Sequence, residues 1–98
     1  TIQNGAAEAL LTLRQYAEVP KVLERVRFYY PSFLRTHLNL GAAYIQLKEV
    51  GKAISEFESV IGINPFHPAA YIALGKLYEQ IGQPDRAARA RKSLELLR

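Results

Sequence analysis

The sequence predicts an all-α domain of about six helices, folded as a solenoid of three helix-turn-helix hairpins. The first observation is a repeat, because five residues recur in phase 34 positions further on: Leu40, Gly41, Tyr44, Gln46 and Ala53 return as Leu74, Gly75, Tyr78, Gln80 and Ala87. The second is that apolar residues inside each unit are spaced three and four apart, which indicates amphipathic helices. A fixed period of this length, filled by two such helices, is typical of stacked helical hairpins.

The apolar residues of the first two units place four helices. The first unit shows them at Ala6, Ala7, Leu10, Leu11 and Leu13, and again at Val19, Val22, Leu23 and Val26. The second unit shows them at Leu34, Leu38, Leu40, Tyr44 and Leu47, and again at Ala53, Ile54, Phe57, Val60 and Ile61. We expect helices at residues 2–14, 18–29, 34–47, 51–62, 68–81 and 85–97. The repeats then cover 1–33, 34–67 and 68–98 of a single domain.

Helix boundaries follow from proline, glycine and charge. Pro31 and Pro65 end helices, since proline cannot donate a backbone hydrogen bond and disfavours helical geometry in the residue before it. Pro20 lies in the first turn of its helix, where its missing N–H does no harm. Gly51 is expected to mark a turn, and Asp85 to sit in the first turn of the last helix, where a negative charge meets the helix dipole favourably.

The repeated glycines predict close packing. Glycine inside a helix costs about 0.5–1 kcal/mol relative to alanine, so its return at Gly75 requires a packing reason. We expect Gly41, with Ala53 facing it, to let the two helices of a hairpin approach closely. Tyr44 and Tyr78, one turn further on, are expected to fill the space between neighbouring units.

These residues give the chain a resemblance to the tetratricopeptide repeat family, whose units carry a Trp-Leu-Gly-Tyr…Ala…Phe…Ala…Pro pattern. The second unit matches at Leu40, Gly41, Tyr44, Ala53, Phe57 and Pro65. The third matches at Leu74, Gly75, Tyr78 and Ala87, with Arg91 replacing the usual Phe. In the first unit Ala7, Val19 and Leu23 take the places of Gly41, Ala53 and Phe57. The resemblance implies a right-handed superhelix with a concave face.

Composition excludes several kinds of chemistry. The chain has no cysteine, so it forms no disulfide, thiol nucleophile or cysteine-based zinc site. Its only histidines are His37, expected to be partly buried, and His67, expected in a turn. Glu56 and Glu58 are expected on a solvated flank. We therefore predict no enzymatic activity, no metal site and no cofactor.

Charge and chain ends bound the partners and the compartment. The formal net charge is +4, and the basic residues Arg86, Arg89, Arg91, Lys92 and Arg98 gather in the last helix. We interpret them as the polar outer face of a terminal repeat, in preference to a nucleic-acid or lipid surface. No apolar run approaches the length of a membrane span. The sequence shows no secretion leader. It contains no methionine, which is expected of a segment cut from a longer protein. The compartment therefore stays open, with the cytoplasm preferred.

The resemblance implies that the first helix of each unit lines the concave face and that this groove holds a peptide. Carried over position by position, the predicted lining is Asn4, Glu8, Leu11 and Thr12, then Arg35, Leu38, Asn39, Ala42, Ile45 and Gln46, then Ala69, Ile72, Ala73, Lys76, Glu79 and Gln80. Among these, Arg35 is expected to be the best anchor, through a bidentate contact with a carboxylate. Co-chaperone members clamp an acidic tail with two Lys, two Asn and one Arg, but of those places only that of Asn39 is matched. We therefore reject that function.

The predicted function is a protein-binding adaptor that presents a preordered surface to its partner. The expected partner is a protein or peptide rather than a small-molecule substrate. Two alternatives remain open at this point. The chain could be the repeat arm of a larger enzyme, positioning a substrate for a catalytic domain elsewhere. It could also be a structural segment that forms a homodimer through its end helices, where Leu94, Leu96 and Leu97 are expected to be partly exposed.

Overall fold

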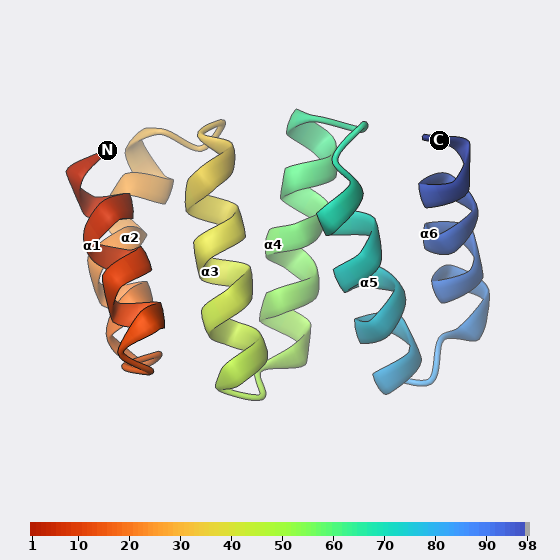
Figure 1. Cartoon of the computed structure of the whole chain (residues 1–98), viewed down its shortest axis with the longest axis horizontal. Coiled ribbons are helices and arrows are strands. Elements are labelled where there is room, and N and C mark those ends of the chain that lie inside the picture. Colours follow the sequence, from red (N-terminus) through yellow and green to blue (C-terminus); the bar gives the residue numbers. More distant parts are fainter. Residues whose placement is uncertain (98) are drawn as a thin grey trace.

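The computed structural model describes residues 1–97, which fold into six α-helices. Figure 1 shows them as three successive antiparallel hairpins set side by side, with the chain ends at opposite sides of the molecule. The helices are α1 (Ile2–Thr12), α2 (Glu18–Tyr29), α3 (Leu34–Gln46), α4 (Val50–Ile63), α5 (Pro68–Gln80) and α6 (Pro84–Leu96). The predicted all-α helical-repeat solenoid is confirmed.

Each hairpin turns through the same backbone motif at the same place in the repeat. Arg14, Lys48 and Gly82, spaced by 34 residues, all adopt positive φ, at 60°, 61° and 73°. After α3, Lys48 N donates to Ile45 O (3.1 Å) and the next residue, Glu49, donates from N to Tyr44 O (3.0 Å). This pair of bonds is the Schellman arrangement that ends a helix in a left-handed residue.

The turn motif corrects two sequence-based expectations. The first helix ends at Thr12 rather than at residue 14, because Arg14 leaves the helical region. Gly51 does not mark a turn, since α4 already begins at Val50. The left-handed backbone conformation of Lys48 was not predicted, because that conformation is uncommon for residues other than glycine.

The core runs through all three hairpins and follows the repeat. Leu40 and Leu74 are 0% and 2% exposed, and Tyr44 and Tyr78 are 5% and 8% exposed. The first unit keeps the same geometry, because Ala7, Val19 and Leu23 are fully buried at the positions of Gly41, Ala53 and Phe57. The predicted packing role of both tyrosines is confirmed.

The glycine in α3 leaves room for an aromatic ring. A Cβ atom at Gly41 would lie 2.7 Å from Cε2 and 2.8 Å from Cζ of Phe57 on α4, closer than real Cβ atoms approach other atoms. The equivalent position in α5 is less crowded, because a Cβ atom at Gly75 would meet Arg91 Cγ at an ordinary 3.6 Å. The close approach predicted at Gly41 is therefore made by Phe57, and the replacement of the third aromatic by Arg91 relaxes it.

Candidate functional site

The predicted groove residues of the first and second hairpins are joined by a polar network between α1 and α3. Asn4 Nδ2 donates to Thr36 Oγ1 (3.1 Å) and to Thr1 Oγ1 (3.0 Å). Asn39 Nδ2 donates to Asn4 Oδ1 (3.0 Å) and to Glu8 Oε2 (3.1 Å). Asn4 is fully buried and Asn39 is 8% exposed.

The burial of Asn4 corrects its assignment as a partner-binding residue, because a side chain with no accessible surface cannot touch a ligand. Its amide instead holds the first hairpin in register with the second. The repeat pattern could not show this, since it places Asn4 at the same position as Leu38 and Ile72, whose side chains remain partly or largely exposed. Thr1 and Thr36 complete the network and were missed by the sequence reasoning.

Arg35 makes the bidentate contact expected of it, but with a residue of its own chain. Its Nε donates to Glu8 Oε2 (2.7 Å) and its Nη2 donates to Glu8 Oε1. The hydrogen bond from Arg35, together with that from Asn39, lowers the pKa of Glu8, and the same pairing raises the pKa of Arg35. The guanidinium is thus already occupied by a carboxylate, so a ligand must compete with Glu8 for it.

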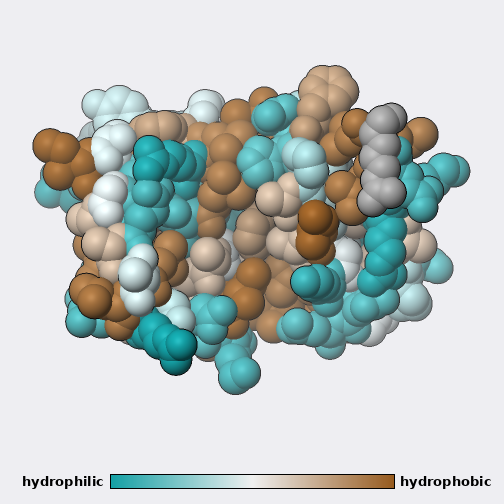
Figure 2. All heavy atoms as spheres, in the orientation of Figure 1, coloured by the Kyte–Doolittle hydropathy of each residue, from teal (hydrophilic) through white to brown (hydrophobic). Residues whose placement is uncertain are grey.

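The accessible part of the predicted groove lies over α3 and α5. Leu38, Ala42 and Ile45 are partly buried on α3, whereas Ala69, Ile72, Lys76 and Glu79 are exposed on α5. Figure 2 shows hydrophobic side chains gathered between polar ones in the middle of the face it presents, over α3 and its neighbours.

The charges on the α5 side of this surface differ in their pairing. Glu79 Oε1 lies 2.5 Å from Arg91 Nη2 of α6. Lys76 has no carboxylate within ion-pair distance among residues 1–97. The surface therefore combines an apolar strip with one ammonium group that has no partner in the described chain.

A second polar cluster, which was not predicted, joins α2, α3 and α4 through Arg27, His37 and Glu56. Glu56 is 4% exposed, and its Oε1 accepts from Arg27 Nη1 (3.1 Å) and lies 3.5 Å from His37 Nδ1. The expectation that Glu56 is solvated is therefore wrong. His37 is buried, as predicted, and its Nε2 lies 2.6 Å from Pro31 O.

The ionisation of His37 follows from its two contacts. The hydrogen bond to Glu56 raises the pKa of His37 above its ordinary 6.5, although burial opposes this change. Tyr71, the repeat equivalent of His37, donates from its hydroxyl to Pro65 O (2.7 Å). Both side chains therefore tie the start of a first helix to the proline that precedes it.

The α6 surface carries the exposed groups that the sequence indicated, apart from Arg98, which lies outside the described residues. Arg86, Arg89, Arg91 and Lys92 are exposed, and Leu96 is 77% exposed. Arg86 stacks its guanidinium over the Tyr78 ring, 5.8 Å from the centroid. Within residues 1–97 no group of three metal-ligating acidic, His or Cys side chains occurs, and no helix is long and apolar enough to cross a membrane.

The arrangement of six helices in three hairpins defines an all-α helical-repeat protein. The profile of the tetratricopeptide repeat family matches residues 34–67, which are α3 and α4 with the loop that follows. This match identifies residues 34–67 as a tetratricopeptide repeat, and the third unit carries the same pattern.

Two curated relatives agree with this assignment. The chain is 33% identical over 84 residues to small glutamine-rich tetratricopeptide repeat-containing protein 2 of Saccharomyces cerevisiae, covering 86% of this chain and 22% of that protein. It is 30% identical over 79 residues to cell division cycle protein 27 homolog A of Arabidopsis thaliana, covering 81% of this chain and 11% of that protein. The chain therefore spans less than a quarter of the length of either relative.

Solved structures of MamA show the same fold. A mutant of MamA superimposes with a TM-score of 0.90 at 22% identity, covering 99% of this chain and 71% of that chain. A crystal structure of MamA gives a TM-score of 0.88 at 25% identity, covering 93% of this chain and 53% of that chain.

Proposed function

We propose that the chain is a protein–protein interaction scaffold that binds a partner segment on the surface formed by α3 and α5. The observation that supports this most directly is the set of accessible apolar side chains on the two helices, called the apolar strip: Leu38, Ala42 and Ile45 on α3 and Ile72 on α5, with Lys76 one turn after Ile72. Ile72 is 47% exposed, so burying it against a partner would remove apolar surface from water. The family match and the relatives support a scaffold role.

The partner segment is expected to carry apolar side chains and a carboxylate. The apolar side chains would lie on the strip, while the carboxylate would meet the ammonium group of Lys76. The polar network of Asn4, Asn39, Glu8 and Arg35 holds α1 against α3 and thereby preorganises this surface. A surface that is ordered before binding avoids part of the entropy cost of association.

The test compares how much partner protein is captured by variants that introduce or reverse a charge on this surface and by matched variants at other positions. Ile72→Glu is expected to abolish capture from native lysate, because it places a charge on the apolar strip. Ile81→Glu is the matched control, since Ile81 is the same residue type, 42% exposed, and lies at the end of α5. Lys76→Glu and Lys92→Glu form a second pair, in which only the first is expected to weaken capture.

Circular dichroism of every variant must remain that of the wild type for the comparison to hold. If the proteins retained by the wild type are retained equally by Ile72→Glu and Lys76→Glu, the α3–α5 surface is not the binding surface.

A further inference from the structure

A hollow lies between α4 and α6 on the opposite side of α5 from the proposed binding surface. Its volume is about 330 Å³, it is open to solvent, and it is lined by Glu58, Ile61, Tyr71, Leu74, Tyr78, Arg86, Arg89, Ala90 and Ser93. At about 100° per residue, Tyr71, Leu74 and Tyr78 are centred about 130° around α5 from Ile72, Lys76 and Glu79. We call this hollow the α4–α6 furrow.

The repeat supplies an internal comparison. The furrow between α2 and α4 occupies the same place one repeat earlier, and there Arg27 and Glu56 form an ion pair at 3.1 Å beside His37. The residues 34 positions later are Ile61, Ala90 and Tyr71. The ion pair of the first furrow is therefore absent from the second, and the hollow there is somewhat larger, at about 330 Å³ compared with about 270 Å³.

The lining charges differ by one carboxylate. In the first furrow, the carboxylates of Glu24 and Glu56 face the cations of Arg27 and Lys52. In the α4–α6 furrow a single carboxylate, that of Glu58, faces Arg86 and Arg89. One further carboxylate would restore the balance of the first furrow.

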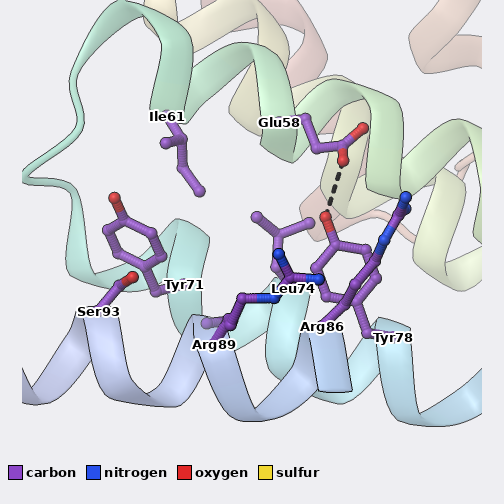
Figure 3. A pocket seen from close by; sticks show the side chains of 9 residues that line it. Glu58, Ile61, Tyr71, Leu74, Tyr78, Arg86, Arg89 and Ser93 are labelled. Atoms are coloured by element: carbon purple, nitrogen blue, oxygen red, sulfur yellow. Dashed lines mark hydrogen bonds between the residues drawn. The ribbon is translucent and has the colours of Figure 1, made fainter. Parts of the chain in front are cut away.

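The two arginines are available to such a group. Glu58 Oε2 is engaged by the Tyr78 hydroxyl at 2.7 Å rather than by an arginine. Neither Arg86 nor Arg89 lies within ion-pair distance of a carboxylate among residues 1–97. Figure 3 shows Arg89 extending from α6 into the middle of the furrow, between Glu58 and the end formed by Ile61 and Tyr71, whereas Arg86 extends beside Tyr78 at the other end.

We propose that the α4–α6 furrow is a second binding site, which takes a peptide segment bearing a carboxylate next to an apolar side chain. The carboxylate meets Arg86 and Arg89 and substitutes for the one that Glu56 supplies in the first furrow. The apolar side chain rests on Ile61 and Tyr71, which are partly exposed. The open form of the furrow suits a chain passing along it, and its volume is near the lower limit of about 300 Å³ for small-ligand pockets.

The experiment is a titration of the ¹⁵N-labelled protein with short peptides, followed by amide chemical shifts. The first probe is N-acetyl-Gly-Leu-Glu-Leu-Gly-amide, and its control replaces Glu with Gln. The second probe, N-acetyl-Gly-Gly-Leu with a free carboxyl end, separates a chain terminus from an acidic side chain as the source of the carboxylate. We expect at least one of the two carboxylate probes to shift residues of the furrow, and the Gln peptide to bind more weakly by about tenfold or more, the factor that about 1.4 kcal/mol provides.

Variants drawn from the repeat sharpen the test. Arg89→Ser introduces the residue found at the equivalent Ser55 and is expected to abolish binding. Ala90→Glu introduces the residue found at Glu56 and is expected to block the furrow while preserving the fold. Lys92→Ser, on the same helix but outside the lining, is expected to bind as the wild type does.

The proposal is overturned if neither carboxylate probe binds at millimolar concentration, if the Gln peptide binds equally well, or if Arg89→Ser leaves binding unchanged. Shifts confined to α3 and the Ile72 side of α5 would also overturn it, and would assign the carboxylate to the other surface. Because Ile72→Glu leaves the furrow intact, the two proposals can fail independently.

Discussion

Gly41 and Gly75 occupy equivalent positions in the repeat, and replacing each with alanine tests whether packing requires a glycine there. The quantity measured is the change in the free energy of unfolding. At Gly41 the new Cβ atom would lie 2.7 Å from the Phe57 ring, which is 6% exposed and has little room to move. Overpacking of this kind costs about 1–3 kcal/mol. The higher helix propensity of alanine returns about 0.8–1 kcal/mol, so Gly41→Ala is expected to be destabilising by up to about 2 kcal/mol.

At Gly75 the same substitution has the opposite sign. The nearest atom is Arg91 Cγ at 3.6 Å, an ordinary contact on a flexible side chain. Only the propensity gain then remains, and Gly75→Ala is expected to stabilise the fold by about 0.8–1 kcal/mol. The two variants should differ by about 1–3 kcal/mol, which for a domain of this size separates their Tm values by on the order of 10 °C.

Thermal and urea unfolding followed by circular dichroism give both values. Phe57→Leu, alone and with Gly41→Ala, completes a double-mutant cycle, and the cost of Gly41→Ala should shrink when the ring is removed. Equal stabilities of Gly41→Ala and Gly75→Ala, or a cost at Gly41 that persists without the ring, would show that Phe57 does not require the glycine.

Two further predictions follow from the polar contacts. Because its folded-state pKa lies above 6.5, His37 contributes stability that is fully present below about pH 6.5 and is lost as the pH rises through that folded-state pKa. Unfolding of the wild type between pH 5.5 and 8.5 should show this loss, and both His37→Gln and Glu56→Gln should remove it; an unchanged pH dependence in either variant would contradict the assignment. Burial, and to a smaller extent the hydrogen bond to Glu58, raises the pKa of Tyr78 to about 12. Tyr78→Phe is expected to cost about 1 kcal/mol in urea unfolding, whereas Tyr44→Phe, whose hydroxyl makes no hydrogen bond within residues 1–97, should cost less; equal costs would mean that the Tyr78–Glu58 bond contributes nothing.

The sequence by itself determined the repeat and therefore the fold. Leu40, Tyr44 and Ala53 recur 34 residues later, and a backbone that must bury the same apolar face twice adopts the same hairpin twice. Helix bounds were predicted within two residues, because the hydrophobic period and the prolines mark them locally. The turn at Lys48 escaped prediction, since glycine is the usual signal for a left-handed residue.

Only the tertiary structure decided how the polar residues are used. Asn4 occupies a groove position in the repeat, yet α1 and α3 approach closely enough to bury it against Thr36 and Asn39. The helical period assigns Glu56 to a solvated flank, but Arg27, from another hairpin, covers it in the folded chain. The periodicity of a helix shows which of its faces is apolar. The pairing of a charged side chain depends instead on residues that are distant in sequence and come close only in the folded chain.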